Sequence, residues 1–244
     1  MDLIEINIPA FDECDNLQLL IPQILEEIAR CDHFAFRVKV IVRHDEPQST
    51  LELLDNLNVE GIRRQPDNSF GSAISTGIAT TARESNYVVF MDADGSHQPA
   101  TIIKLANHAK QSGADVVIAS RYVDGGKTDN SVILKLMSKT LNKVFGVILG
   151  IRCKDISTNF KIYKSNLIQD VELSCKNFDV VEELLLKVKV ASGPNFSFIE
   201  IPDHFEQRKL GESKRRLTVF IISYIITLVK LRVWSSIENR NRRR

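Results

Sequence analysis

The fold is decided by Tyr87-Val88-Val89-Phe90-Met91-Asp92-Ala93-Asp94, residues 87–94 of a 244-residue chain. Five apolar residues in a row are typical of a strand that is buried on both faces, as in a parallel sheet covered by helices. The strand runs directly into two carboxylates that are one residue apart. Ligands of open parallel sheets bind beyond the carboxyl ends of the strands. The stretch therefore predicts a central strand and the edge of the sheet at which a ligand binds.

The segments around this strand alternate between strand and helix patterns. Asp15 and Gln18 resemble a capping box at the start of the first helix. Such alternation predicts an α/β fold with a mostly parallel central sheet and helices on both sides. Past Ser120 the alternation ends. We expect strands at 3–8, 36–42, 59–64, 87–91 and 115–119, and helices at 16–30, 48–57, 71–83, from Pro99, at 132–149 and at 181–190.

Composition excludes several classes of protein. With 32 Lys and Arg against 31 Asp and Glu, the net charge of +1 gives no global field that recruits nucleic acid. The first residues carry two acids and no basic segment, so they do not resemble a secretory signal, and no apolar run reaches the roughly 18 residues of a spanning helix. We expect a cytoplasmic protein without a nucleic-acid partner, a disulfide framework or a zinc site. Its four cysteines are scattered, at Cys14, Cys31, Cys153 and Cys175.

Acidic residues follow three of the predicted strands. Residues 12–13 follow the first strand, 45–46 the second, and Asp92 and Asp94 the strand at 87–91. Carboxylates this close together need hydrogen-bond donors or a cation, and oxygen ligands favour Mg²⁺ or Mn²⁺. The simpler alternative is that Asp92 and Asp94 only cap the helix that begins near Pro99. The pattern by itself leaves both possibilities open.

Five blocks of sequence carry a resemblance to a known family. Residues 8–17 and 89–99 resemble the opening and metal motifs of family 2 glycosyltransferases. Residues 119–126, 155–161 and 200–214 resemble further motifs of its dolichyl-phosphate mannose synthase branch. The resemblance implies a GT-A (Rossmann-like) nucleotide-sugar-binding fold over residues 1–213. The sequence pattern itself adds a basic amphipathic membrane-interface helix and tail over residues 214–244.

The activity that the resemblance implies is metal-dependent, inverting glycosyl transfer. A sugar would move from a GDP- or UDP-linked donor to a polyprenyl or dolichyl phosphate, with Mg²⁺ or Mn²⁺ as cofactor. Asp92 and Asp94 would bind the metal, Asp94 on the donor diphosphate and Asp92 near the ribose. The residues implied to bind the nucleotide-sugar are Pro9, Ala10, Phe11, Glu13, Asp45, Asp92, Ala93, Asp94, Arg208 and Lys214.

On the acceptor side, the resemblance implies that Arg121 and Lys127 hold the phosphate. A phosphate monoester is largely an anion at neutral pH and needs little help from a general base. Cations must offset its repulsion from the donor diphosphate, which suits Arg208 on a loop that closes over the donor. Asp155 would orient the sugar or assist deprotonation. The catalytic residues expected are Asp94, Arg121, Asp155 and Arg208.

One loop departs from the family pattern. His44 stands where relatives carry the first of two acids, which leaves the selectivity for the base open. We assign neither His44 nor His97 a catalytic role, since a lone histidine is more often a packing or hydrogen-bonding residue.

Two other functions are compatible with the sequence. The acceptor could be a sugar hydroxyl of a cell-surface glycan, which would require a general base such as Asp155. Alternatively, the protein could bind a nucleotide-sugar without catalysis. The sequence leaves open whether the metal is Mg²⁺ or Mn²⁺. It also leaves open the sugar, the base and the oligomeric state.

The chain ends in an apolar and then basic segment. Residues 217–229 contain no charge and would form a helix of about 20 Å, too short to span a bilayer. Thr227 and Lys230 would share its polar face, and Trp234 would suit the depth of lipid headgroups. We expect a peripheral protein on the cytoplasmic face of a membrane. The alternative is a core helix or an oligomer contact.

Overall fold

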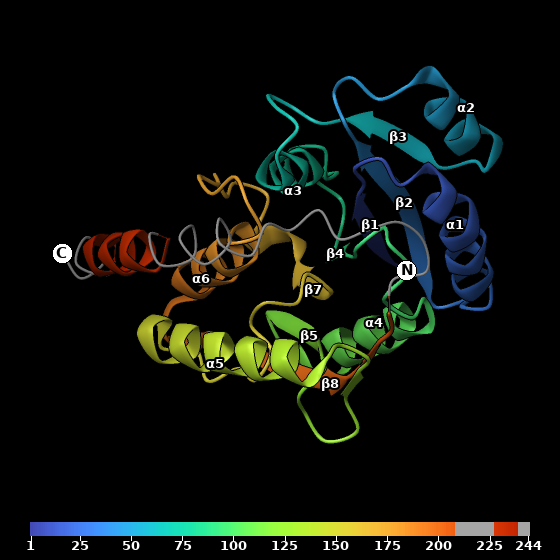
Figure 1. Cartoon of the computed structure of the whole chain (residues 1–244). Helices are drawn as coiled ribbons and strands as arrows, with labels where there is room; N and C mark the ends of the chain where they lie inside the picture. Colours follow the sequence, from blue (N-terminus) through green and yellow to red (C-terminus); the bar gives the residue numbers. More distant parts are fainter. Residues whose placement is uncertain (208–226, 239–244) are drawn as a thin grey trace.

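A computed structural model describes residues 1–207 and 227–238 of the chain. Helices and strands alternate as predicted through residue 120, and the order of elements after that residue is more irregular (Figure 1). The strands are β1 (Asp2–Pro9), β2 (Phe34–Val42), β3 (Glu60–Arg63), β4 (Tyr87–Phe90), β5 (Val116–Ser120), β6 (Lys127–Thr128), β7 (Lys161–Lys164), β8 (Phe198–Pro202) and β9 (His204–Phe205). The α-helices are α1 (Cys14–Ala29), α2 (Gln48–Asn56), α3 (Phe70–Ala79), α4 (Ala100–Ser112), α5 (Val132–Leu149) and α6 (Val180–Ser192), with 3₁₀ turns at Ser165–Leu167 and Gly193–Asn195.

The central sheet has seven strands in the order β3-β2-β1-β4-β7-β5-β8. All neighbours are parallel except β7, which runs antiparallel between β4 and β5. The α/β class and the mostly parallel sheet are therefore confirmed. The short strands β6 and β9 form a separate two-stranded sheet.

Helices cover both faces of this sheet. Side chains of β4 alternate between two apolar clusters, with Val89 in the first and Phe90 in the second, and both are fully buried. The first cluster is completed by α1 and α4, and the second by α3, α5 and α6. Burial of β4 on both faces confirms the interpretation of residues 87–91 as a central strand.

One local expectation was wrong. The predicted capping box does not form, because α1 begins at Cys14 with Glu13 as its N-cap and without a capping side chain. Asp15 lies instead within the first turn, where a negative charge still favours the helix dipole. The sequence also gave no indication of β7, which is four residues long and begins with the fully buried Lys161.

The described part of the C-terminal segment, residues 227–238, is a helix beside α6 (Figure 1). Leu228 and Leu231 join the second apolar cluster, and Trp234 packs against that cluster. Thr227, expected on a polar face, is buried and donates a hydrogen bond to Asp179. Most of the apolar run 217–229 and the basic end of the chain lie outside the described residues. Within residues 1–207 and 227–238, no helix has the length and apolarity to cross a membrane.

Candidate active site

The candidate site lies where β2, β1 and β4, which are neighbours in the sheet, reach their carboxyl ends. Pro9 ends β1 and is followed by the buried Ala10 and the part-exposed Phe11. The Arg43 guanidinium, just beyond β2, donates to the carboxylates of Asp12 and Asp45. This bridge shows that the acidic segments after the first two strands meet, as the sequence predicts.

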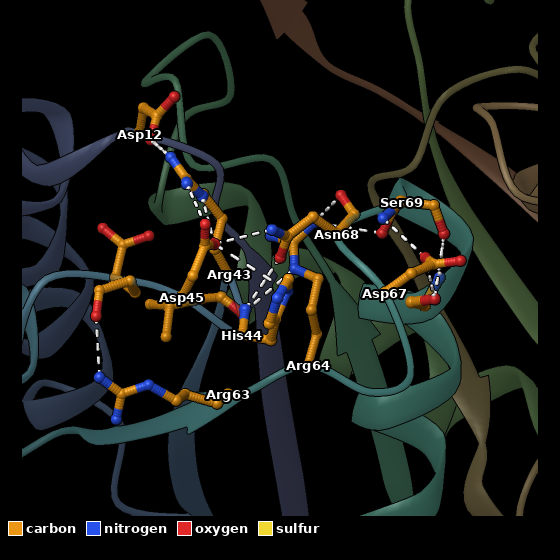
Figure 2. A network of polar contacts seen from close by, with 12 residues as sticks. Asp12, Arg43, His44, Asp45, Arg63, Arg64, Asp67, Asn68 and Ser69 are labelled. Atoms are coloured by element: carbon orange, nitrogen blue, oxygen red, sulfur yellow. Dashed lines mark hydrogen bonds and ion pairs between the residues drawn. The ribbon is translucent and has the colours of Figure 1, made fainter.

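Arg43 also holds Asp45 in a fixed position (Figure 2). Its Nε and Nη2 atoms lie 2.9 and 2.7 Å from the two Asp45 oxygens, and Asn68 Nδ2 donates to Asp45 Oδ1 at 2.7 Å. These hydrogen bonds, from Arg43 first and then Asn68, keep the pKa of Asp45 well below its usual range. The Arg43 guanidinium also lies 5.1 Å from the ring centroid of Phe11. Asp45 and Phe11, both expected to bind the nucleotide, therefore share one cationic neighbour.

At the departure from the family pattern, His44 makes its hydrogen bond to this network through its backbone. Its backbone N–H donates to Asn68 Oδ1 at 2.8 Å, and its ring is half exposed, 3.9 Å from Asp45. His44 thus fixes Asn68, which in turn fixes Asp45, through a main-chain group that any residue other than proline provides.

Arg64, which the sequence analysis missed, lies beneath this network (Figure 2). Its guanidinium is 1% exposed and donates to the carbonyl oxygens of Ala10, Ile41, Val42 and residues 68–69. Burial lowers its pKa to about 10. Arg64 therefore ties together the three segments around Phe11 and Asp45. An isolated arginine at the end of a strand gives no sequence signal for this role.

The carboxylates after β4 are held separately. Asp94 Oδ1 accepts hydrogen bonds from Ser96 N at 3.1 Å and from Ser96 Oγ at 2.5 Å. Asp92 Oδ1 accepts from Asn159 Nδ2 at 3.1 Å. Helix α4 has Pro99 as its N-cap and no capping side chain. The alternative that Asp92 and Asp94 serve only to cap this helix is therefore wrong.

The donor atoms present suit a hard divalent cation. Asp92 and Asp94 supply carboxylate oxygens, while Ala93 between them is buried. No group of three or more His, Cys, Asp or Glu side chains in the described part of the chain could hold a metal ion by itself. Mg²⁺ is usually bound by one or two carboxylates together with substrate phosphates and water. The residues therefore fit a metal that binds together with a diphosphate.

His97, to which the sequence analysis gave no catalytic role, is buried behind Asp92. Its Nδ1 lies 3.1 Å from Asp203 Oδ2, and its Nε2 lies 3.6 Å from Asp92 Oδ2. Burial lowers the pKa of His97, but the neighbouring carboxylates of Asp203 and Asp92 outweigh it and raise the pKa to about 9. The only sequence signal for this contact was the position of His97 in the same loop as Asp92.

Arg121 and Asp155, expected on the acceptor side, form a buried ion pair. The Asp155 carboxylate is fully buried and accepts from Arg121 Nε at 2.7 Å, Nη2 at 2.6 Å and backbone N at 2.8 Å. Burial opposes the Arg121 charge, but Asp155 raises the guanidinium pKa above its usual range. Glu200 accepts from the Asp155 backbone N–H at 3.0 Å. Asp155 is thus a rigid partner of Arg121.

The remaining predicted residues are more dispersed. Glu13 at the N-cap of α1 accepts from Asn16 Nδ2 at 2.6 Å. Lys127 is exposed on β6. Arg208 and Lys214 lie outside the described residues.

Comparisons with known proteins identify the family of this chain. The model of the family "Glycosyl transferase family 2" matches residues 5–172. Polyprenol monophosphomannose synthase of Mycolicibacterium smegmatis is 32% identical over 219 residues, which cover 85% of this chain and 78% of that protein. Dolichol-phosphate mannosyltransferase of Pyrococcus furiosus is 31% identical over 239 residues, covering 95% of this chain and 64% of that protein.

The fold has solved counterparts as well. Glucosyl-3-phosphoglycerate synthase of Mycobacterium tuberculosis, in complex with Mn²⁺, UDP and glucosyl-3-phosphoglycerate, has a TM-score of 0.69 and is 16% identical, covering 94% of this chain and 80% of that chain. This likeness shows the GT-A-like fold. The extent of the family match and of the sequence identity shows that the chain is a glycosyltransferase and belongs to family 2 of these enzymes.

Proposed function

We propose that this glycosyltransferase moves a mannosyl group from a nucleotide-sugar to a polyprenyl phosphate, in a metal-dependent and inverting reaction. The observation that carries the proposal is the identity of 32% with a polyprenol monophosphomannose synthase over 85% of the chain. A second mannosyltransferase, named for undecaprenyl phosphate, is 25% identical over 217 residues. The geometry of the site supplies the chemical argument.

The donor half of the proposal rests on the carboxyl ends of β1, β2 and β4. The base and ribose would lie against Phe11 and Asp45, and Asp92 would lie near the ribose. Glu13, which follows Phe11 in the loop after β1, would also contact the nucleotide-sugar. Asp92 and Asp94 would hold Mg²⁺ or Mn²⁺ on the diphosphate. In that position the cation would offset the negative charge that grows on the leaving nucleoside diphosphate. Ser96 fixes the Asp94 carboxylate through two hydrogen bonds to one oxygen, which supports this role.

The acceptor half needs positioning more than proton transfer. An oxygen of the acceptor phosphate would form a bond to the anomeric carbon while the bond from that carbon to the donor diphosphate breaks. The bonding electrons leave with the nucleoside diphosphate, and no proton has to be removed from a phosphate that is already an anion. Direct attack inverts the anomeric centre. Because the charge of Arg121 is balanced by Asp155, we place Lys127 as a further cation at the phosphate.

The role that we propose for Asp155 is to position Arg121. Each carboxylate oxygen accepts two hydrogen bonds, from Arg121 and Asn142, and the side chain is fully buried, so neither oxygen is open to a sugar hydroxyl. This geometry favours a phosphate acceptor over a glycan hydroxyl.

An exposed apolar stripe on α5 supports the lipid character of the acceptor. Helix α5 exposes apolar side chains along one face, and several of them are more than two-thirds exposed: Val132 79%, Ile133 73%, Leu136 67% and Val147 75%. Lys139 and Lys143 lie beside this stripe and are also exposed. Apolar side chains bordered by cations are typical of a helix lying in a membrane interface. We propose that the protein binds peripherally to the cytoplasmic face of a membrane through this helix.

The experiment that tests the proposal measures release of nucleoside diphosphate. GDP-mannose and UDP-linked sugars are each incubated with Mg²⁺ or Mn²⁺, with and without a short-chain polyprenyl phosphate in detergent. We expect release that requires both the metal and the lipid phosphate. Release that is indifferent to the lipid would contradict the proposed acceptor, and binding without any release would favour a non-catalytic protein.

A further inference from the structure

We propose that His97 is a positioning residue for the donor site, which fixes the carboxylate of Asp92 and anchors it to the turn between β8 and β9. The inference rests on the proposed donor-binding role of Asp92. It concerns a side chain that touches neither of the reacting groups. Its support comes from burial and from contacts on both sides of the imidazole ring.

The His97 ring is buried between two aromatic rings. It is 3% exposed, and its centroid lies 4.7 Å from that of Phe160 and 5.1 Å from that of Phe205. Aromatic rings on two sides leave the two nitrogens pointing in opposite directions, one to Asp203 and the other to Asp92. A ring packed in this way fixes the positions of the two carboxylates relative to each other.

Asp203 is a firm anchor for the ring. Its Oδ1 accepts from Thr101 Oγ1 at 2.9 Å, while its Oδ2 faces His97 Nδ1. Its backbone N–H donates to Ser120 O at 3.1 Å, and its carbonyl oxygen accepts from Lys127 N at 2.9 Å. Asp203 is therefore fixed by α4, β5 and β6 together.

On the other side, the two oxygens of Asp92 face different groups. Asn159 Nδ2 donates to Oδ1 at 3.1 Å, and His97 Nε2 lies at an ion-pair distance of 3.6 Å from Oδ2. His97 Nε2 is buried and makes no hydrogen bond with the described residues, so Asp92 is the acid it faces. Together, Asn159 and His97 set the plane of the carboxylate, as partners of metal-binding carboxylates commonly do.

A second contact ties the same two segments together. The backbone N–H of Glu206 donates to Ser96 O at 2.8 Å, and Gln98 Nε2 donates to Glu206 Oε1 at 3.1 Å. The loop that carries Asp92 and Asp94 is therefore joined to Glu206, directly after β9, by one backbone and one side-chain hydrogen bond. The position of Asp92 depends on this junction, with His97 as its buried link.

The test uses the full chain and measures binding of GDP and UDP by calorimetry across a titration of Mn²⁺. The variants are His97→Gln, which can reach one carboxylate only, Asp203→Asn and the double variant. His108→Gln is the matched control, because His108 is an exposed histidine on α4 whose ring contacts the Lys104 carbonyl oxygen. We expect His97→Gln to raise the Mn²⁺ concentration for half-maximal nucleotide binding by about 10-fold or more. His108→Gln should leave it unchanged.

The double variant separates positioning from general packing. If His97 acts through Asp203, the two substitutions have less than additive effects on the Mn²⁺ concentration for half-maximal nucleotide binding, called the half-saturating concentration below. A merely structural role would lower the fraction of folded protein, seen by thermal unfolding, without moving the half-saturating concentration. Should His97→Gln not fold, Thr101→Val removes one bond to Asp203 and is expected to shift half-saturation in the same direction. Unchanged half-saturation in the folded variants overturns the inference, whereas a wild-type protein that binds neither nucleotide overturns the proposed function itself.

Discussion

Asp94 is the residue that we propose to hold the metal on the donor diphosphate. Replacing it with Asn keeps its size and removes the negative charge that would hold the metal. We expect Asp94→Asn to lower the rate of nucleoside diphosphate release by about 100-fold or more, because transition-state charge loses its stabilisation. Asp170→Asn, at an acid that is mostly exposed and far along the chain, serves as control. A variant with the wild-type rate and metal requirement would show that Asp94 does not bind the metal.

Asp155 separates two chemical interpretations of the acceptor side. Removing its charge leaves Arg121, whose side chain is only 10% exposed, without its negatively charged partner. We expect Asp155→Asn to lower the free energy of unfolding by about 3 kcal/mol, as for other broken buried pairs. Urea denaturation measures this loss. A general base would behave differently, since its replacement would abolish transfer while leaving stability nearly intact.

Lys161 predicts a pH dependence of stability. Its ammonium group donates to the carbonyl oxygens of Ile156 and Thr158, and burial lowers its pKa from 10.5 to about 8. The unfolded chain then binds more protons than the folded chain between about pH 8 and 10.5, so this residue's contribution to stability rises with pH there.

The measurement is urea denaturation of the wild type and of Lys161→Met at pH 7.5 and at pH 9.5. We expect the wild type to gain stability relative to the variant at the higher pH. Lys164→Met, on the same strand but part-exposed, is the control. A difference that is constant across this range would mean that Lys161 titrates normally.

At the scale of single elements, the predictability of the fold depended on length and periodicity. Strands β1 and β4 were predicted because their apolar pattern follows from their position between two layers of helices. Strand β7 was not predicted because it is short and lies antiparallel between β4 and β5, a position that its neighbours in the sheet determine. The order of residues along the chain carries no signal for such an insertion.

The same distinction applies to the candidate site. Asp92 and Asp94 follow a recognisable strand, so their place could be predicted from sequence. Arg64 and His97 act through carbonyl oxygens and carboxylates that are brought to them only by folding. Buried polar residues of this kind resemble ordinary core residues until their contacts are known.

Helix α5 carries the prediction for membrane association. Glutamate in place of Ile133 and Leu136 puts charge on the exposed apolar stripe without disturbing the buried face of the helix. We expect this double variant to lose most of its cosedimentation with vesicles that contain anionic lipid, while its thermal unfolding is unchanged. Leu19→Glu, at an exposed leucine on α1, is the control. Equal binding of the α5 variant and the control would place the membrane contact elsewhere.

At the scale of the whole molecule, the two halves of the sheet divide the work that we propose. The parallel half, from β3 to β4, presents the acids of the donor side. The second half brings Arg121 after β5 together with Asp155 ahead of β7. Asn159 joins the halves through Asp92, so donor and acceptor residues belong to one continuous edge. This arrangement fits direct transfer between two negatively charged substrates.

The most direct test compares two acceptors that differ only in the phosphate. A short-chain polyprenyl phosphate and the corresponding polyprenol are each incubated with GDP-mannose and Mn²⁺, and the lipid products are identified by mass spectrometry. We expect a mannosylated lipid phosphate, with an inverted anomeric centre by NMR, and no product from the alcohol. Transfer to the alcohol at a comparable rate would contradict a phosphate nucleophile and would require a general base that Asp155, held by Arg121, does not provide.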